Sequence, residues 1–404
     1  MIVKIEKGTA RGKVTAPPSK SMAHRLVISA AMCRGESRIR GISDCEDVRA
    51  TVTCLTALGV SVVREGDDLV VVGTDMTSTA PNGVLDAGES GSTLRFLIPV
   101  AMLSGKTVMF RGKEGLMRRP MDVYERLASE RGLVFLGDGE SITVRGRLPS
   151  GEYHVVGNVS SQFISGLLFA LPTLEGDSRI RITPPIESRS YIEMTLAAIR
   201  LFGIRAEWEG EHTIFIPGGQ HYTAADVTVE GDYSGAAFTD AFNILSGEVS
   251  VLGLNPDSIQ GDKVYKKYYE MLDSGIPTVH IGDCPDLGPI LFALAAAKRG
   301  GVFTGTKRLK IKESDRAEAM AEELKKFGVT VSVYEDKTVV YPVRFEPPTE
   351  RLHGHNDHRI VMSLAILLTL VGGEIEGAEA ISKSYPQFFS DLRKLGIGVT
   401  EYEI

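Results

Sequence analysis

The stretch "ELKKFGVTVSV", residues 323–333, joins an amphipathic helical segment to a β-rich segment through a single glycine, Gly328. Glycine is the usual residue just past a helix because, without a Cβ atom, it adopts the left-handed backbone conformation at little cost. The same pattern occurs six times along the chain, around Gly59, Gly132, Gly203, Gly275, Gly328 and Gly396. Each of these glycines is therefore predicted to end a helix in the left-handed conformation.

Each repeat also contains an earlier helix that is apolar almost all round. These helices include the segments "LVISAAM", "LRFLIPVAML", "FISGLLFALP", "AAFTDAFNIL", "PILFALAAA" and "RIVMSLAILL". A helix that is apolar on every side belongs in a core, whereas the helix before each glycine is amphipathic and belongs on a surface. The segment 317–327 is an example of the second kind, with Met320, Leu324 and Phe327 at helical spacing among charges.

Four of the repeats continue as β-hairpins, with polar turns at residues 65–68, 137–140, 209–212 and 334–337. The predicted unit is therefore βαβαββ and spans about 70 residues, with its first helix buried and its second exposed. A period of this length is also found in solenoids. Because the units are large, we favour closure into two groups of three, each around three buried helices, which gives an α/β fold with two domains.

The boundary between the two groups is predicted from a second similarity. The segment "GKVTAPPSKS" (12–21) leads into the first unit, and "ADVTVEGDYS" (225–234) leads into the fourth. If the chain crosses between domains at these two strands, one domain contains residues 1–16 and 231–404, and the other contains residues 17–230.

Composition excludes several classes of function. The chain has 404 residues with 43% hydrophobic and 24% charged residues, as in ordinary globular proteins, and a net charge of −7. That charge gives no general attraction to nucleic acid or to acidic membranes. The longest apolar stretch, 360–371, is too short to span a bilayer, and the N-terminus lacks the apolar segment of a signal peptide.

The cysteines point to a reducing compartment. They form no CxxC pair, and their spacing indicates neither a disulfide framework nor a zinc site: Cys33, Cys45, Cys54 and Cys284. We therefore expect reduced thiols in a cytoplasmic protein, with neither a nucleic acid nor a membrane as partner.

The starts of the buried helices are rich in Ser, Gly, Asp and Arg. They read "SKSMAHR", "ESGSTLR", "NVSSQF", "GDYSGAA", "CPDLGP" and "NDHRI". A helix N-terminus is a natural anion site, although Ser and Asp are also the standard N-cap residues. Basic residues near a helix start oppose the helix dipole, yet four occur there: Lys20, Arg25, Arg95 and Arg359. An anionic ligand would supply the missing negative charge.

Further cations precede the exposed helices. Seven basic residues lie near the start of an element: Lys20, Arg25, Arg119, Lys312, Arg316, Arg359 and Lys383. One phosphate needs two or three cations, so this number indicates several anionic groups bound together. If the three buried helices of each domain are parallel, their starts converge on one face, and two such faces would form a cleft.

Two carboxylates are candidates for acid–base chemistry. Asp286 and Glu313 lie among these cations, which keep a carboxylate ionised and able to accept a proton. An N-cap role for Asp286 is equally compatible with the sequence. A metal site is suggested by three nearby histidines, His353, His355 and His358. Because no further pair of ligands has suitable spacing, we expect no bound metal. The chain also lacks a G-x-G-x-x-G motif and a P-loop, which gives no support for a nucleotide cofactor.

Ten motifs occur in the order of one known family. They are "PPSKSMAHR", "GESGSTLRF", "LMRRP", "VSSQF", "SRSYIE", "VEGDYSGAAF", "CPDLGP", "KIKESDR", "NDHR" and "SKSYPQF". On these motifs the chain resembles 5-enolpyruvylshikimate-3-phosphate (EPSP) synthase along its whole length. The resemblance implies a two-domain inside-out α/β barrel of six βαβαββ units, with the active site in the cleft between domains.

The resemblance also implies a reaction. The enolpyruvyl group of phosphoenolpyruvate (PEP) would be transferred to the 5-hydroxyl of shikimate 3-phosphate through a tetrahedral intermediate, with release of phosphate, in aromatic amino acid biosynthesis. No cofactor and no metal are implied, the partners are the two small substrates, and the protein is expected to be a monomer. Asp286 would accept the hydroxyl proton, and Lys20 or Glu313 would handle the methylene proton.

Binding residues are implied motif by motif. Those for shikimate 3-phosphate would be Lys20, Ser21, Arg25, Ser160, Ser161, Gln162, Ser188, Tyr191, Asp286 and Lys312. Those for PEP would be Lys20, Gly91, Arg119, Gln162, Arg316, Arg359 and Lys383. Two positions depart from the family pattern: Glu89 stands where many members have Asn, and Arg308 stands where some have Asn.

Two alternatives stay open at this point. The related enolpyruvyl transferase that acts on UDP-N-acetylglucosamine shares the fold, but it carries a cysteine in the loop before its Arg-Pro, and "GKEGLMRRP" (112–120) has none. The second alternative is a non-catalytic anion-binding protein, which the same helix starts would also suit.

Overall fold

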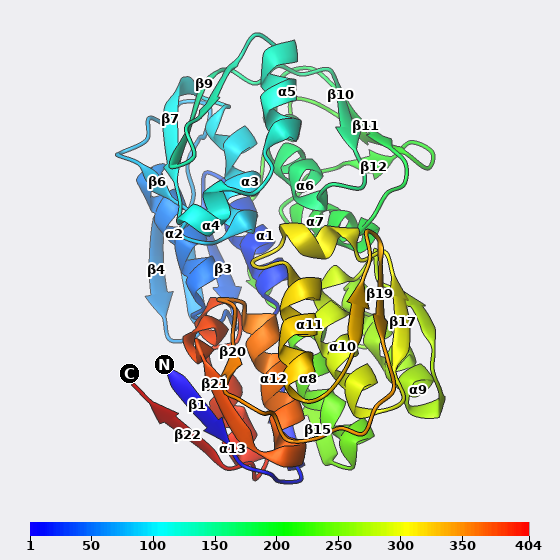
Figure 1. Cartoon of the computed structure of the whole chain (residues 1–404). Coiled ribbons are helices and arrows are strands. Elements are labelled where there is room, and N and C mark those ends of the chain that lie inside the picture. Colours follow the sequence, from blue (N-terminus) through cyan, green and yellow to red (C-terminus); the bar gives the residue numbers. More distant parts are fainter. Residues whose placement is uncertain (404) are drawn as a thin grey trace. The chain divides into compact units, whose positions relative to one another are not determined.

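The computed structural model describes residues 1–403 and divides into two compact units. The terminal unit consists of Met1–Pro17 and Gly231–Ile404, and the central unit consists of Pro18–Glu230. Each unit has its own hydrophobic core. Each unit contains three of the six repeats. Figure 1 labels their helices and strands in the colours of the sequence.

The central unit contains the first three repeats. The first comprises β14 (Val227–Thr228), α1 (Lys20–Ala31), β3 (Glu36–Arg40), α2 (Glu46–Ala57), β4 (Ser61–Glu65) and β5 (Asp68–Val72). The second comprises β6 (Leu85–Asp86), α3 (Gly91–Ala101), β7 (Gly105–Arg111), α4 (Glu114–Met117), α5 (Asp122–Glu130), β8 (Val134–Gly137) and β9 (Ser141–Gly146). The third comprises β10 (Glu152–Val156), α6 (Ser161–Ala170), η1 (Leu171–Thr173), β11 (Ser178–Thr183), α7 (Arg189–Leu201), β12 (Glu207–Trp208) and β13 (Thr213–Ile216).

The terminal unit contains the other three. The fourth repeat comprises β2 (Arg11–Thr15), α8 (Tyr233–Asp240), η2 (Ala241–Leu245), β15 (Glu248–Leu252), η3 (Gly261–Val264) and α9 (Tyr265–Ser274). The fifth comprises β16 (Thr278–His280), η4 (Pro285–Leu287), α10 (Gly288–Ala297), β17 (Gly301–Thr304), η5 (Lys307–Ile311), α11 (Arg316–Lys326), β18 (Val331–Val333) and β19 (Lys337–Val340). The sixth comprises β20 (Leu352–His353), α12 (His358–Val371), β21 (Gly373–Glu376), η6 (Ala378–Lys383), α13 (Phe388–Lys394), β22 (Val399–Tyr402) and β1 (Ile2–Ile5).

Every repeat has its own small sheet, and five of the six have the strands and helices of the predicted unit. In the third repeat, β10 precedes α6 in the sequence and β11 follows it, and the two strands pair in parallel. In the hairpin β12–β13 that comes next, β13 pairs antiparallel to β11. A parallel pair needs such a crossover, and the buried helix supplies it. All four predicted hairpins are present, and the first turns between Glu65 and Asp68.

The fourth repeat departs from the pattern. Its sheet has two strands, β2 and β15, and within residues 1–403 no hairpin follows α9. The prediction of a left-handed cap is therefore wrong for Gly275, which has φ −174° and leaves the helix in extended backbone. Ile276 precedes Pro277, and a residue before proline is restricted to extended backbone. The other five glycines have φ between 64° and 91°, as predicted.

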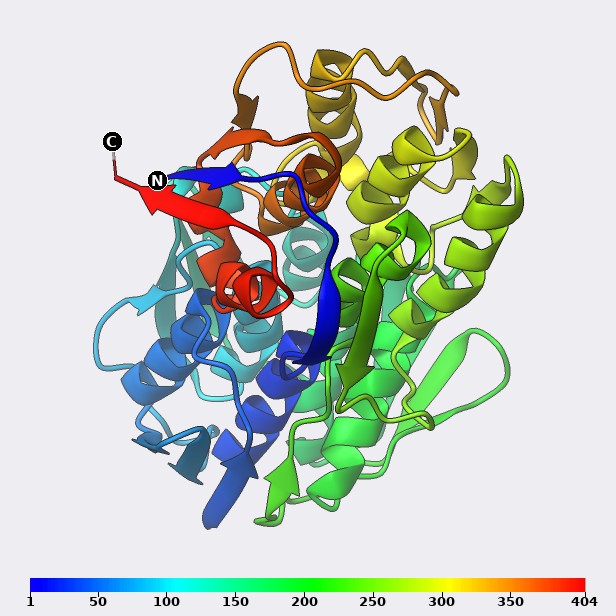
Figure 2. The same ribbon diagram turned by 90° about the horizontal axis from the view of Figure 1, so that it is seen from below.

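The strands that lead into the first and fourth repeats are exchanged in the sheets. β2 precedes α1 in the chain but pairs with β15, and β14 precedes α8 but pairs with β3. The N-terminal strand β1 lies between β21 and β22 and completes the sheet of the sixth repeat. Figure 2 shows it beside the C-terminal strand.

The buried and surface helices follow their sequence patterns. α1, α3 and α6 are buried in the central unit, and α8, α10 and α12 are buried in the terminal unit. The amphipathic α11 buries Met320 and Leu324, and Phe327 at its end is buried too. All four cysteines are free and buried. Within residues 1–403, no helix has both the length and the apolar character that a membrane span requires.

Candidate functional site

The starts of the six core helices share an unusual charge pattern. None of them carries an acidic residue in its first turn. The surface helices α2 and α11 carry Glu46, Asp47 and Glu318 there, whereas α7 and α9 carry no acid. At α8 and α12 the N-cap carboxylates of Asp232 and Asp357 supply the negative charge that stabilises a helix N-terminus. The caps of α1, α3 and α6 are the neutral hydroxyls of Ser19, Ser90 and Ser160, which leave this favourable position to a bound anion.

Arg25 joins the start of α1 to α7 in the central unit. Its guanidinium is buried and donates from Nε to Thr195 Oγ1 at 2.8 Å, from Nη1 to the Ser21 carbonyl at 2.6 Å and from Nη2 to the Tyr191 carbonyl at 3.0 Å. Burial lowers the pKa of Arg25 to about 10. The structure thus brings together Ser21, Arg25 and Tyr191, which the sequence analysis assigned to one substrate.

Lys20 begins α1 and forms an ion pair with a carboxylate of α2. Its Nζ donates to Asp47 Oδ2 at 2.8 Å, and both side chains are largely buried. Asp47, in the first turn of α2, was not among the predicted site residues. Its burial beside Lys20 makes it a further candidate.

Gly91 lies against two arginines and a glutamine. A Cβ atom at this position would lie 2.9 Å from Arg119 Nη1, 3.2 Å from Arg95 Nη1 and 3.6 Å from Gln162 Oε1. Arg95 also donates from Nη1 to Gln162 Oε1 at 2.8 Å. The start of α3, the start of α6 and the loop at Arg119 therefore meet at one point, where only glycine leaves room for these side chains.

Three predicted serines lie at the starts of α6 and α7. Ser160 caps α6 by accepting the Gln162 N–H at 3.3 Å, and Ser161 is the first residue of the helix. Ser188 immediately precedes α7, is buried and has φ 55°. Left-handed backbone is uncommon at residues other than glycine and tends to occur at functional sites.

In the terminal unit, Asp286 is surrounded by cations. Its Oδ1 lies 3.1 Å from Lys312 Nζ and 2.8 Å from Arg316 Nη1, and its Oδ2 lies 3.1 Å from Arg359 Nη2. Its side chain does not cap α10, which begins after Leu287 without a side-chain cap. Burial lowers the pKa of Lys312, and the charge of Asp286 partly offsets that effect. Three cations at this distance favour the ionised form of the carboxyl.

Arg316 organises three carboxylates. Only 1% of its side chain is exposed, and it donates to Asp286, to Glu313 Oε2 at 2.6 Å and to both oxygens of Asp357, at 2.8 and 3.3 Å. Burial disfavours its charge, but Asp357, Glu313 and Asp286 together raise the pKa of Arg316 above its ordinary value. The guanidinium is thus a fixed, permanent cation within this cluster.

Lys383 is held by the loop before α12. Its Nζ donates to the carbonyl oxygen of Asn356 at 2.6 Å and to Asn356 Oδ1 at 2.8 Å. The next residue, Asp357, is fully buried, binds Arg316 and caps α12 by accepting the Arg359 N–H at 2.9 Å. Asn356 and Asp357 lie in the motif "NDHR", but neither was predicted to have a role.

A further buried carboxyl, Asp262, lies in the same cluster. Its Oδ2 accepts a hydrogen bond from the Ser234 hydroxyl at 2.5 Å. Burial, with the charge of Asp286 as the second cause, raises the pKa of Asp262 to about 6. No motif singled out this residue, because its burial comes from packing between η3 and α8.

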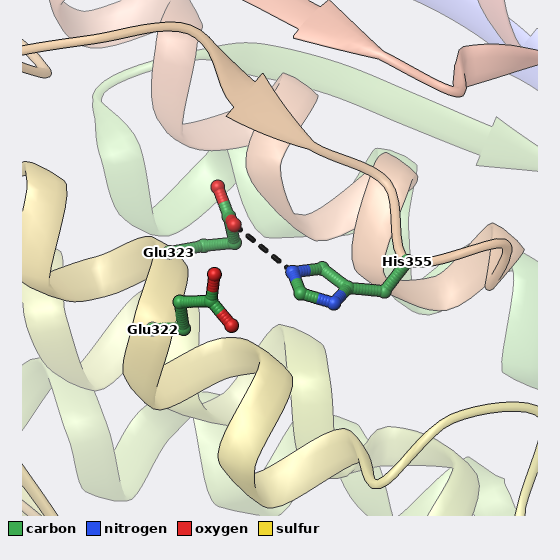
Figure 3. Close-up of side chains that lie close together, drawn as sticks. All are labelled: Glu322, Glu323 and His355. Atoms are coloured by element: carbon green, nitrogen blue, oxygen red, sulfur yellow. Dashed lines mark hydrogen bonds and ion pairs between the residues drawn. The ribbon is translucent and has the colours of Figure 1, made fainter.

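Within residues 1–403, one group of potential metal ligands lies close together, and it consists of Glu322, Glu323 and His355 (Figure 3). Glu323 already accepts from Lys326 Nζ at 3.0 Å and pairs with His355 Nε2 at 2.9 Å. Lys326 therefore already neutralises the charge of Glu323, the buried member of this group. Of the three histidines considered for metal binding, only His355 belongs to it.

The candidate residues fall into two sets, each described within its own unit. The central half-site consists of Lys20, Ser21, Arg25, Gly91, Arg119, Ser160, Ser161, Gln162, Ser188 and Tyr191. The terminal half-site consists of Asp286, Lys312, Glu313, Arg316, Arg359 and Lys383. Of the two departures from the family pattern, Glu89 pairs with Lys113 at 2.9 Å in the central unit, and Arg308 is buried in the terminal unit.

Comparisons with known proteins agree with these features. The family model described as EPSP synthase (3-phosphoshikimate 1-carboxyvinyltransferase) matches residues 5–392. A relative named 3-phosphoshikimate 1-carboxyvinyltransferase from Clostridium novyi is 37% identical over 100% of this chain and 99% of its own. One of the same name from Clostridium acetobutylicum is 38% identical with the same coverage. A solved structure of EPSP synthase from Acinetobacter baumannii has a TM-score of 0.79 and 22% identity over 100% of both chains, so the fold is the same.

Proposed function

The chain belongs to the EPSP synthase family and is an enolpyruvyl transferase of the shikimate pathway, and we propose that Asp286 is the base of its reaction. The reaction transfers the enolpyruvyl group of PEP to the 5-hydroxyl of shikimate 3-phosphate and releases phosphate. The UDP-N-acetylglucosamine enzyme and a non-catalytic binder, the two alternatives, are not favoured by the family match and the named relatives.

The observation that carries this proposal is the contact of Asp286 with three cations, Lys312, Arg316 and Arg359. A carboxylate that stays ionised can accept the proton of the attacking hydroxyl. The hydroxyl oxygen then forms a bond to the central carbon of PEP while the methylene carbon gains a proton. In the second step the bond to the phosphate oxygen breaks, the new methyl group loses a proton, and inorganic phosphate leaves.

We assign the methylene proton to the pair of Lys20 and Glu313. Lys20 is paired with Asp47, and Glu313 is paired with Arg316. An ammonium group can donate a proton, and a carboxylate can accept one, so together the pair has both functions that the two steps need. The remaining cations stabilise negative charge as it develops in the transition state.

For shikimate 3-phosphate we propose the hydroxyl-rich part of the central half-site together with two terminal residues. The set is Lys20, Ser21, Arg25, Ser160, Ser161, Gln162, Ser188, Tyr191, Asp286 and Lys312. Its support is the hydrogen bonding of Arg25 to the main chain at Ser21 and Tyr191, which fixes a buried cation between two helix starts. A phosphate group suits such a position because main-chain N–H groups and a guanidinium are available to it.

For PEP we propose Lys20, Gly91, Arg119, Gln162, Arg316, Arg359 and Lys383. Its support in the central unit is the close approach of Arg119 and Gln162 to Gly91. In the terminal unit, Arg359 and Lys383 are nearly fully buried cations held by Asp286 and Asn356. PEP carries two negatively charged groups, a carboxylate and a phosphate, which would pair with these cations.

We also propose that both half-sites contact the substrates at once, so that closure of the two domains completes the site and excludes water. The enzyme would act as a monomer in the cytosol, where four free thiols remain reduced. Small-angle scattering would then show a smaller radius of gyration when shikimate 3-phosphate is added. An unchanged radius of gyration at saturation would count against closure.

The proposed base is tested by Asp286→Asn. We expect kcat/KM to fall by about a hundredfold or more, since the hydroxyl proton loses its acceptor. Asp283→Asn is the matched control, because this exposed carboxylate lies three residues away in the same segment and has no assigned role. Equal activity of Asp286→Asn and the wild type would overturn the assignment.

A further inference from the structure

The loop between β20 and α12 contains two consecutive residues with left-handed backbone. His355 has φ 49° and Asn356 has φ 52°, and neither is glycine. Backbone of this kind persists at ordinary residues only where the surrounding contacts hold it. Within the loop, residues 353–357, the His355 N–H is bonded to His353 Nδ1 at 3.0 Å and the Asp357 N–H to the Gly354 carbonyl at 2.9 Å, and further contacts come from outside the loop.

Glu323 on α11 supplies these contacts. None of its side chain is exposed, and it lies beside His355 in Figure 3. Its Oε1 is 2.9 Å from His355 Nε2, and its Oε2 accepts the main-chain N–H of His353 at 2.9 Å. Lys326 Nζ, at 3.0 Å, balances the charge. One carboxylate thus binds the loop at two points.

The far end of the same loop holds the cations of the terminal half-site. Asn356 accepts two hydrogen bonds from Lys383, and Asp357 binds the guanidinium of Arg316 and the main chain of Arg359. Lys383, Arg316 and Arg359 are the three terminal residues proposed for PEP.

Helix α11 binds both ends of the loop. Glu323 and Arg316 are seven residues apart on this helix, a spacing that puts them on the same face. Glu323 binds the loop at His353 and His355, and Arg316 binds it at Asp357. A rigid helix thereby fixes the distance between the strained backbone and the cations it positions.

We propose that Glu323 is a positioning residue for PEP: with His355 it holds loop 353–357 in the left-handed conformation that fixes Lys383 and Arg316. This inference depends on the proposed function for the identity of the ligand. The effect of Glu323 on the loop is independent of the proposed function and can be measured separately.

The kinetic test is Glu323→Gln, which keeps the shape of the side chain and removes its charge. We expect the KM for PEP to rise by roughly tenfold or more, because small displacements of binding groups weaken binding strongly. The dissociation constant of shikimate 3-phosphate should stay within about twofold of the wild type. Glu322→Gln is the matched control, since its exposed side chain neighbours Glu323 on the same helix. An equal loss of affinity for both substrates would indicate a general structural role and overturn the proposal.

A second variant tests the pairing. His355→Asn keeps a residue that tolerates left-handed backbone but removes the imidazole that reaches Glu323. We expect it to raise the KM for PEP as Glu323→Gln does, and the double variant to be no worse than the more affected single variant. Fully additive effects would show that the two residues act independently. If Glu323→Gln does not fold, His355→Asn alone tests whether the contact between the two residues is needed for PEP binding.

Hydrogen exchange tests the loop without any need for activity. In the wild type the Asp357 N–H is bonded to the Gly354 carbonyl at 2.9 Å, and the Arg359 N–H is bonded to Asp357. We expect Glu323→Gln to speed exchange in residues 353–359 by tenfold or more, roughly, and to leave α10 unchanged. Unchanged exchange would overturn the proposal. Faster exchange in an enzyme whose wild type does not turn over would instead refute the proposed function alone.

Discussion

Arg316 donates a hydrogen bond of 2.8 Å from Nη1 to Oδ1 of Asp286, the carboxylate proposed as the base. The same guanidinium binds Glu313 and Asp357, so one planar cation sets the positions of three carboxylates. Guanidinium groups suit this task because their five donors point in fixed directions, whereas an ammonium is a single point charge. The geometry of the terminal half-site therefore depends on arginine and not merely on positive charge.

Replacement of this arginine by lysine tests that dependence. Arg316→Lys keeps the charge but cannot bind three carboxylates in one plane, so we expect kcat/KM to fall by about a hundredfold. The measurement is steady-state kinetics, with circular dichroism as a check on folding. Arg344→Lys serves as the control, because that arginine is 90% exposed. Wild-type kinetics in Arg316→Lys would refute the claim.

A methyl group at Gly91 should weaken the binding of PEP but not that of shikimate 3-phosphate. Gly91→Ala would place Cβ 2.9 Å from Arg119 Nη1 and 3.2 Å from Arg95 Nη1, so these side chains must move. We expect the KM for PEP to rise about tenfold and the dissociation constant of shikimate 3-phosphate to stay unchanged. Gly115→Ala is the control, since nothing lies within 4 Å of a Cβ atom there. Weaker binding of shikimate 3-phosphate in Gly91→Ala would show that the two substrates are assigned to the wrong residues.

The buried Asp262 should make stability depend on pH. Burial, followed by the charge of Asp286, raises its pKa to about 6 from an ordinary value of 3.8. The folded protein therefore binds this proton more tightly than the unfolded chain, and the free energy of unfolding falls as pH rises between these values. The loss amounts to about 3 kcal/mol once the group is ionised in both states.

Asp262→Asn removes this contribution. Relative to the variant, the wild type should lose stability steadily as pH rises from about 4 to about 7, measured as the difference between their unfolding free energies in urea. Taking the difference removes the effects of titrating groups that do not interact with Asp262, whereas the neighbouring Asp286, Arg359 and Asp232 act on its carboxyl and contribute to the measured difference. Parallel curves for the two proteins would show that Asp262 does not titrate in this range.

Ion pairs suggest which group donates the methylene proton. Lys20 is paired with Asp47, which favours its protonated form, whereas Glu313 is paired with Arg316, which favours its ionised form. We therefore expect Lys20→Met to abolish incorporation of solvent deuterium into the methylene group of PEP, and Glu313→Gln to retain it at a reduced rate. Mass spectrometry of the substrate after partial turnover in D₂O measures this. Incorporation that survives in Lys20→Met would exclude Lys20 as the donor.

The repeat could be predicted because its signals are local. A glycine after an amphipathic helix, an all-apolar helix and a polar hairpin turn each need only a few neighbouring residues, and five of the six glycines have the predicted conformation. The exchange of β2 and β14 between sheets could not be predicted, because it depends on pairing between distant segments. The lack of a hairpin after α9 agrees with the sequence, in which no polar hairpin turn was assigned to the fourth repeat and the interval between Gly275 and Gly328 is only 53 residues.

In the candidate site, too, some residues could be predicted from neighbouring sequence and others depend on distant contacts. Lys20, Gly91 and Asp286 lie in motifs at helix starts, where charge and residue type are informative on their own. Asp47, Asp262 and Glu323 could not be found in this way, because their roles come from burial against partners on other elements. Sequence patterns reveal the groups that face a ligand more readily than the groups that hold them in place.

Phosphate release from PEP, measured with and without shikimate 3-phosphate, tests the enzymatic activity most directly. We expect rapid release of inorganic phosphate only when both substrates are present, with one enolpyruvyl product formed per phosphate. Phosphate release from PEP alone at the same rate, or no release with both substrates present, would contradict the enolpyruvyl transfer.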